Sequence, residues 1–308
     1  MNYKKLGGTG VEIPPIIFGT SCLGNLYQAV PFETKVEILS EMFKNMHGPV
    51  LLDSAGKYGA GLALEVIGKG LSELNVPEER VLISNKLGWY RVPLTTPEPT
   101  FEKGAWADLE FDAVQKISYD GILECWQQGC ELLGNQYKPQ IVSVHDPDEY
   151  LATATSPEDR ETRFGDIIGA YKALIELKEK GETKAVGVGS KDWKVIQEIS
   201  REINLDWVML ACSYTIYTHP AELQAFLDEL VERNIGIINS AVFNAGFLTG
   251  GQYFDYRIPD PNDSEDKKLF EWREKFFQLC ERFNVLPANA CVNFGMSHPG
   301  IISTALNT

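Results

Sequence analysis

The stretch KAVGVGSKDWKVIQEISREINLDWVMLACSY, residues 184–214, contains two short apolar runs separated by an amphipathic one. The runs at 184–190 and 207–214 are apolar almost throughout, which is typical of strands that are covered on both faces. Residues 192–204, between them, have the apolar spacing of a helix that packs on one side. A strand, a helix and a second strand in this order predict a parallel βαβ unit.

The same alternation runs through the whole chain of 308 residues. We expect strands at 14–20, 49–53, 80–86, 140–146, 184–190, 207–214, 235–241 and 300–305, and helices at 33–46, 62–74, 119–133, 164–181, 192–204, 220–234 and 268–284. Gly181 and Asn234 lie where a helix should stop. Eight strands of this kind predict an α/β fold of the (β/α)8 TIM barrel type, with residues 1–308 forming a single domain.

Two further features of the barrel can be read from the spacing of its elements. Residues 3–13 place two short strand-like pieces around glycines, which predicts an N-terminal β-hairpin closing one end of the barrel. Long connections at 87–118, 147–163 and 249–266 each follow an expected strand. They should therefore lie on the C-terminal face, where barrel enzymes build their active sites.

Composition excludes several classes of protein. Lys and Arg number 28 against 43 Asp and Glu, a formal net charge of −15 that argues against binding to nucleic acid or to anionic lipid. Six cysteines are spread along the chain without a C-x-x-C pair, which favours free thiols in a reducing compartment. No apolar run is long enough to span a membrane, and the N-terminus has no signal-peptide pattern. We expect a cytoplasmic protein with a small-molecule substrate and without a nucleic-acid or membrane partner; its oligomeric state is left open.

Four polar residues follow the second, third and fourth expected strands. Asp53, Lys86 and His145 each end a strand, and Tyr58 comes one short loop after Asp53 in LLDSAGKYG, residues 51–59. Because neighbouring strands of a barrel end side by side, these groups are expected to converge. A lysine ammonium beside a phenol should lower its pKa from about 10, and the histidine could hold a substrate oxygen. The predicted site moves a proton without a metal or a covalent nucleophile.

These motifs resemble a known family. The Asp53–Tyr58 segment, Lys86 in SNKLG and His145 in VHD are similar to the catalytic tetrad of the aldo-keto reductases, and the resemblance covers essentially the whole chain. The stretches FGTSCLGNLY (18–27), SYT (213–215) and FNAGFL (243–248) look closest to its branch of sugar and pyridoxal dehydrogenases. That branch includes the D-threo-aldose 1-dehydrogenases, which oxidise L-fucose or galactose at the anomeric carbon to a lactone.

The resemblance implies a role for each matching residue. Tyr58 would be the general acid/base, Lys86 would tune its pKa, Asp53 would balance the charge and His145 would orient the substrate. The implied cofactor is NADP or NAD, extended across the barrel mouth. The residues implied to bind it are Gly19, Thr20, Asp53, Ser190, Tyr214, Phe243, Asn244, Gly246 and Leu248.

The sequence also departs from the family pattern. A Ser-Asn pair common after the fifth strand is replaced by Ser190-Lys191, and Ala211 and Asn239 stand where many members carry a glutamine and a nicotinamide-stacking aromatic residue. The chain stops at Thr308, just after the last expected strand, so the tail that binds the adenosine end is expected to be missing. Without that tail, the sequence does not choose between NAD and NADP.

The leading hypothesis is therefore an NAD(P)-dependent oxidoreductase, most simply an aldose dehydrogenase acting at C1. One alternative is a metal-assisted barrel hydrolase or lyase using His145, Asp146 and Asp148. Another is a regulatory subunit that binds the cofactor and turns over little. The aromatic residues of the first long connection, Trp89, Tyr90 and Trp106, either line a substrate pocket or cover the edge of the core.

Overall fold

The computed structural model describes residues 2–255 and 257–307 and contains a closed barrel of parallel strands. The ring runs β10-β11-β12-β3-β4-β5-β8-β9, so the last strand pairs with the first and no edge is left open. The predicted (β/α)8 barrel is confirmed. Its strands are β3 (Ile16–Gly19), β4 (Val50–Ala55), β5 (Val81–Leu87), β8 (Ile141–His145), β9 (Ala185–Ser190), β10 (Trp207–Ala211), β11 (Gly236–Ser240) and β12 (Ile301–Asn307).

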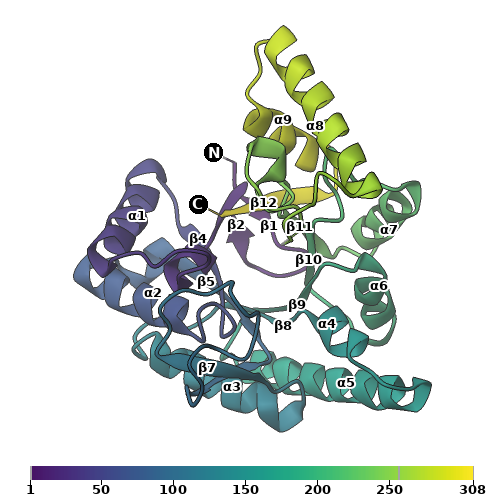
Figure 1. The fold of residues 1–308 in the computed structure, drawn as a ribbon. Helices are drawn as coiled ribbons and strands as arrows, with labels where there is room; N and C mark the ends of the chain where they lie inside the picture. The colour runs from purple at the N-terminus through teal and green to yellow at the C-terminus, as the bar shows by residue number, and fades with distance from the viewer. Residues whose placement is uncertain (1, 256, 308) are drawn as a thin grey trace.

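Helices surround this ring of strands, and α8 and α9 extend beyond it at the top of Figure 1. Their bounds are α1 (Phe32–Asn45), α2 (Leu62–Glu73), α3 (Tyr119–Leu132), α4 (Pro147–Ala152), α5 (Pro157–Glu179), α6 (Trp193–Glu202), α7 (Ala221–Glu232), α8 (Ser264–Arg282) and α9 (Pro287–Gly295), with short 3-10 turns η1 (Ser21–Gly24), η2 (Glu78–Arg80) and η3 (Phe247–Thr249). Gly181 and Asn234, at φ 75° and 56°, take the left-handed conformation that ends a helix. No helix in the described ranges is long and apolar enough to cross a membrane.

Two of the expected long connections contain whole elements that were not predicted, and the third, 249–266, ends in the first residues of α8. The segment 147–163 holds α4 and the first turns of α5, which begins at Pro157 because Ser156 caps it by accepting from the Asp159 amide at 3.1 Å. The segment 87–118 holds the antiparallel pair β6 (Trp89–Pro93) and β7 (Phe111–Gln115). Both segments were expected as loops. The elements α4, β6 and β7 are each too short to show a clear periodicity of apolar residues.

A two-stranded hairpin, β1 (Lys4–Lys5) and β2 (Glu12–Ile13), closes the end of the barrel where its strands begin, as predicted. Leu6 and Ile13 are fully buried against a cluster inside the barrel that includes Trp207. A β-carbon on Gly187 would lie 2.3 Å from the Trp207 ring, so glycine is what lets the indole fill the interior. This end of the barrel is a packed core, and the opposite end is free to carry a site.

Candidate active site

Three neighbouring strands bring the predicted residues together at the C-terminal end of the barrel. In the parallel register Asp53 pairs with Ser84, and Lys86 lies two residues further along β5. β8 continues the sheet, with His145 as its last residue. Side chains two residues apart on a strand share a face. Asp53, Lys86 and His145 are all buried, with exposed fractions of 3 to 4%.

Tyr58 is delivered to this group by the turn that follows β4. The Tyr58 amide donates to the Ala55 carbonyl at 3.1 Å, and the turn packs against η1. A β-carbon on Gly24 would lie 2.7 Å from the Tyr58 carbonyl carbon, and Gly59 takes a φ of 61°. The two glycines allow the backbones to approach closely and fix where the phenol points.

The four side chains form one connected group. Lys86 Nζ donates to Tyr58 Oη at 3.1 Å and also to an Asp53 carboxylate oxygen. Ser84 Oγ donates to the other Asp53 oxygen at 3.0 Å. The rings of Tyr58 and His145 meet edge to face, with centroids 5.6 Å apart. The structure therefore brings all four predicted residues together, around a lysine shared by a phenol and a carboxylate.

The predicted direction of the Tyr58 pKa is wrong for this arrangement. Burial raises the pKa of Tyr58 well above 10, and the negative charges of Asp53 and Asp146 raise it further. Lys86 contacts the hydroxyl, but it is already paired with Asp53 and its charge is largely balanced. Tyr58 is therefore a neutral phenol at pH 7, in the state of a proton donor.

His145 is also neutral. Burial lowers the pKa of His145 well below 6.5, and the nearby Lys86 and Lys57 lower it further. Its Nε2 lies 3.5 Å from Asp146 Oδ2, whereas Nδ1 has no hydrogen-bond partner among the described residues. A carboxylate beside Nε2 favours the tautomer that carries its proton there. His145 can then donate one hydrogen bond to a substrate oxygen.

The sequence analysis did not predict a second group of charged side chains, which lies beside the tetrad. Lys57 Nζ contacts Glu102 at 2.8 Å, Glu149 at 2.8 Å and Asp146 at 3.2 Å. Its side chain is 3% exposed, and its carboxylate neighbours raise its pKa above the ordinary value in spite of burial. The signal was weak, because a lone lysine in a loop is normally a solvated charge and its three partners are distant in sequence.

A model of the aldo/keto reductase family matches residues 15–308. The chain belongs to the aldo/keto reductase family. It is an oxidoreductase, and enzymes of this family use a nicotinamide cofactor.

The curated relatives of this aldo/keto reductase are named for different substrates. The chain is 26% identical over 314 residues to pyridoxal 4-dehydrogenase of Microbacterium luteolum, a match that covers 97% of this chain and 87% of the relative. It is 26% identical over 297 residues to D-threo-aldose 1-dehydrogenase of a Pseudomonas species, covering 91% and 81%. It is 23% identical over 252 residues to L-galactose dehydrogenase of Arabidopsis thaliana, covering 81% and 67%.

Solved structures show the same fold. An aldo-keto reductase from Bacillus halodurans, in its holo form, superposes with a TM-score of 0.69 at 17% identity, covering 100% of this chain and 86% of that one. A glycerol dehydrogenase from Gluconobacter oxydans gives a TM-score of 0.68 at 18% identity, covering 99% and 86%.

The residues predicted to meet the nicotinamide end lie close to the tetrad. Thr20 follows Gly19 at the end of β3, and both its amide and its hydroxyl donate to the Asp53 carbonyl, at 3.0 and 2.9 Å. Ser190 ends β9, is 1% exposed and donates to the Asp192 carbonyl at 3.3 Å. Their roles toward a cofactor stay predictions.

The loop after β11 is folded on itself. Gly246 takes a φ of 92° with open space where a β-carbon would lie, so an extended ligand could approach its backbone. Asn244 is fully buried, donates to Asp255 at 3.0 Å and leaves Oδ1 without a partner among the described residues. Phe243 is partly buried beside this loop, whereas Leu248 is fully buried, backbone included, so its predicted contact with a cofactor has no exposed atom to rest on.

Two positions expected near the nicotinamide face the outer helices. Tyr214 is 5% exposed, stacks on Phe294 and places its hydroxyl 3.2 Å from Ser297 Oγ. Asn239 donates to the Tyr214 and Gly295 carbonyls at 2.8 and 2.9 Å, so it supports this packing. Ser240, the next residue of β11, hydrogen-bonds Leu210 on the neighbouring strand.

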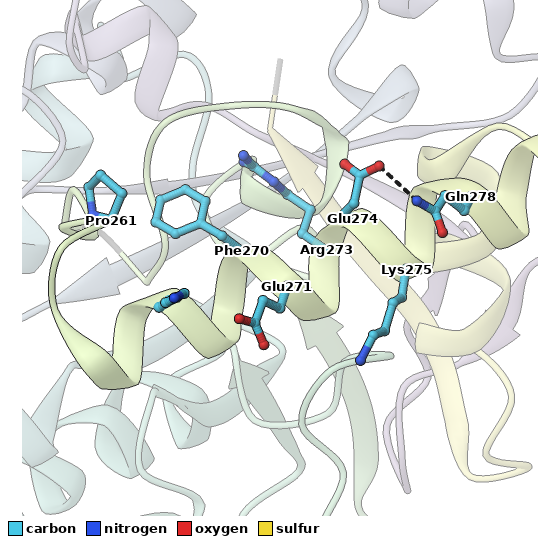
Figure 2. Close-up of a pocket in the computed structure, with 8 residues that line it drawn as sticks. Pro261, Phe270, Glu271, Arg273, Glu274, Lys275 and Gln278 are labelled. Carbon is cyan, nitrogen blue, oxygen red and sulfur yellow. Dashed lines mark hydrogen bonds between the residues drawn. The ribbon is translucent and has the colours of Figure 1, made fainter.

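The described residues fit a bound nicotinamide cofactor in two respects. Asn244 Oδ1 is a buried acceptor without a donor, and Gly246 leaves its backbone open at the barrel mouth. A separate hollow of about 670 Å³ lies along α8, lined by eight residues between Pro261 and Gln278 and by none of the tetrad (Figure 2). The loop and the tetrad, rather than this hollow, are where we would place a ligand.

Proposed function

We propose that this chain oxidises a small sugar at C1 to a lactone with NAD or NADP, or carries out the reverse type of reaction on a related carbonyl compound. The names of two relatives, a D-threo-aldose 1-dehydrogenase and an L-galactose dehydrogenase, support an aldose as the substrate. The observation that carries the proposal is the 3.1 Å contact between Lys86 Nζ and Tyr58 Oη, with Asp53 on the same amine.

Each member of the tetrad has a role in this proposal. In oxidation, Tyr58 Oη takes the proton of the substrate hydroxyl, and in reduction it gives that proton back. Lys86 stabilises the phenolate while it exists, and Asp53 keeps the ammonium in place. His145 Nε2 donates to the same substrate oxygen and orients the reacting carbon. The cofactor, when bound, supplies the other half of the chemistry by accepting or donating a hydride.

The test is turnover followed by the absorbance of the reduced nicotinamide. We expect activity with L-fucose, D-arabinose or galactose, and we expect Tyr58→Phe to reduce kcat by about 10²- to 10⁴-fold, the usual value of a positioned acid or base. Cofactor affinity, measured by fluorescence, should be unchanged. Tyr3→Phe is the matched control, because its hydroxyl donates to Pro49 at a distant site. Turnover that survives in Tyr58→Phe would exclude the assignment of the proton to this residue.

No specific feature of the structure supports the two alternatives, a metal-assisted hydrolase or lyase and a regulatory subunit. Asp146 contacts Lys57, whereas Asp148 accepts from the Asp192 amide at 3.0 Å, so the two carboxylates beside His145 diverge. Within the described part of the chain, no three His, Cys, Asp or Glu side chains are grouped to hold a metal ion. A regulatory subunit would bind cofactor tightly and turn over no carbonyl compound, which the same assay detects.

A further inference from the structure

A carboxylate lies at the place where a substrate should bind. Asp146 follows His145 directly, and its Oδ2 lies 3.5 Å from His145 Nε2, the atom that would hold the reacting oxygen. The same carboxylate acts on Tyr58, since it contributes to raising the pKa of that phenol. Asp146 therefore borders both groups that would contact the substrate.

The structure fixes this carboxylate in place. Asp146 has a φ of 46°, a left-handed conformation that aspartate and asparagine tolerate better than most residues. Lys57 holds Oδ2 at 3.2 Å and is itself held by Glu102 and Glu149. Glu149 also contacts Lys191 at 2.6 Å. A side chain restrained on this scale is pre-organised, so it can discriminate between ligands at little entropic cost.

The group of charged side chains around Asp146 has a hydrogen-bond acceptor that is not in use. Its members are two lysines and three carboxylates, Lys57, Lys191, Glu102, Asp146 and Glu149, so one negative charge is not balanced within it. Among the described residues, no hydrogen bond reaches Asp146 Oδ1, and the side chain keeps 12% of its surface exposed. A ligand with a donor group could therefore reach this carboxylate.

We propose that Asp146 is a specificity-determining residue that accepts a hydrogen bond from a hydroxyl on the carbon next to the reacting carbon. Oxygens on adjacent carbons are separated by roughly one hydrogen-bond length. An oxygen held by His145 Nε2 would thus place its neighbour within reach of the adjacent carboxylate. A substrate without that hydroxyl leaves Asp146 Oδ1 as a partly buried acceptor without a donor, and sites built for hydrogen bonds reject such analogues strongly. This inference rests on the proposed function and narrows its substrates to α-hydroxy carbonyl compounds and vicinal diols.

The experiment compares two aldehydes that differ by one hydroxyl, lactaldehyde and propanal, as substrates for reduction. We expect the wild type to favour lactaldehyde in kcat/KM, and we expect Asp146→Asn to reduce that preference by about tenfold or more, the value of one hydrogen bond to a charged group. Asparagine keeps the left-handed backbone accessible, so the variant should fold. Glu149→Gln is the matched control, because it removes a negative charge from the same lysine and should keep the preference.

Several results would overturn the inference. One is an equal loss with both aldehydes, which would indicate a general electrostatic role for Asp146. Another is an equal effect of Glu149→Gln, which would assign the preference to the charge of the whole group. A wild type without preference would also exclude it.

A failure of the proposed function can be told apart from a failure of this inference. If the wild type reduces neither aldehyde, equilibrium binding decides the role of Asp146, and the proposed function is wrong only if L-fucose, D-arabinose and galactose also give no turnover. Tryptophan fluorescence would report binding of propane-1,2-diol and of propan-1-ol, since Trp106 lies 6.1 Å from the Tyr58 ring between centroids. Tighter binding of the diol that is lost in Asp146→Asn supports the inference, and equal binding of the two alcohols overturns it.

Discussion

Tyr58 shows how burial and charge compete at one residue. The sequence predicts its neighbours correctly, because each of them ends a strand or follows one, and the barrel register brings those ends together. It does not predict the pKa of the phenol, which depends on how deeply the hydroxyl is buried and on Asp146, a residue whose side-chain direction no pattern reveals. Lys86 is shared with Asp53, so its effect on the phenol is smaller than its proximity suggests.

The raised pKa of Tyr58 predicts a directional pH dependence. Oxidation needs the phenolate, and below the raised pKa each unit of pH changes its population about tenfold. We therefore expect kcat/KM for oxidation to rise steadily between pH 7 and 9, whereas kcat/KM for reduction, which uses the phenol, should not fall in this range. Initial rates in both directions across this interval are the measurement. An oxidation rate that reaches its plateau near pH 7 would contradict the raised pKa.

His145 predicts a pH dependence of stability. Its pKa is lowered well below 6.5 in the folded protein, so below pH 6.5 the unfolded chain binds a proton that the folded one does not. Stability contributed by the neutral imidazole is complete well above pH 6.5 and is lost as the pH falls, by up to about 1.4 kcal/mol between pH 7.5 and pH 5.5. Urea unfolding of wild type and of His145→Asn at pH 7.5 and 5.5 tests this. The wild type should lose more stability on acidification, because the other histidines are common to both proteins.

At the scale of elements, the sequence predicts the strands and helices that repeat around the barrel but not the elements that occur once. Eight apolar runs and their helices follow from periodicity, because a strand covered on both faces and an amphipathic helix differ clearly. The pair β6 and β7 was expected as a loop, since an isolated hairpin of five residues per strand has little pattern of its own and packs on α3 only after folding. The strand order followed from the repeat, but the loop conformations that shape the site did not.

The segment between β6 and β7 should depend on Glu102. Its carboxylate contacts Lys57 at 2.8 Å and accepts from the Trp106 indole at 2.8 Å, so one side chain joins the segment to the turn that carries Tyr58. We expect Glu102→Ala to increase amide hydrogen exchange across residues 96–108 and to raise KM more than it lowers kcat. Glu110→Ala, an exposed glutamate of the same segment, is the control. Unchanged exchange in Glu102→Ala would show that the other contacts suffice to hold the segment.

At the scale of the whole molecule, the two ends of the barrel have different tasks. At the end where the strands begin, the β1–β2 hairpin and Trp207 fill the interior with apolar side chains. At the other end, the interior carries Asp53, Lys86 and His145 with their charges and hydrogen bonds. Burying these groups costs free energy, which the packed end offsets. This division predicts that stability and activity can be changed separately.

Leu6 provides the test of that division. It is fully buried in the hairpin, and a β-carbon on Gly236, the first residue of β11, would lie 2.8 Å from its side chain. Leu6→Ala should reduce the free energy of unfolding by about 2–5 kcal/mol, the usual cost of a large cavity, whereas Leu279→Ala, at a side chain 51% exposed, should change it by about 0.5 kcal/mol or less. Under conditions in which Leu6→Ala is folded, kcat/KM should equal that of the wild type, because the cavity lies at the end of the barrel away from Tyr58. A folded Leu6→Ala protein with low activity would show that packing at the closed end also sets the geometry of the tetrad.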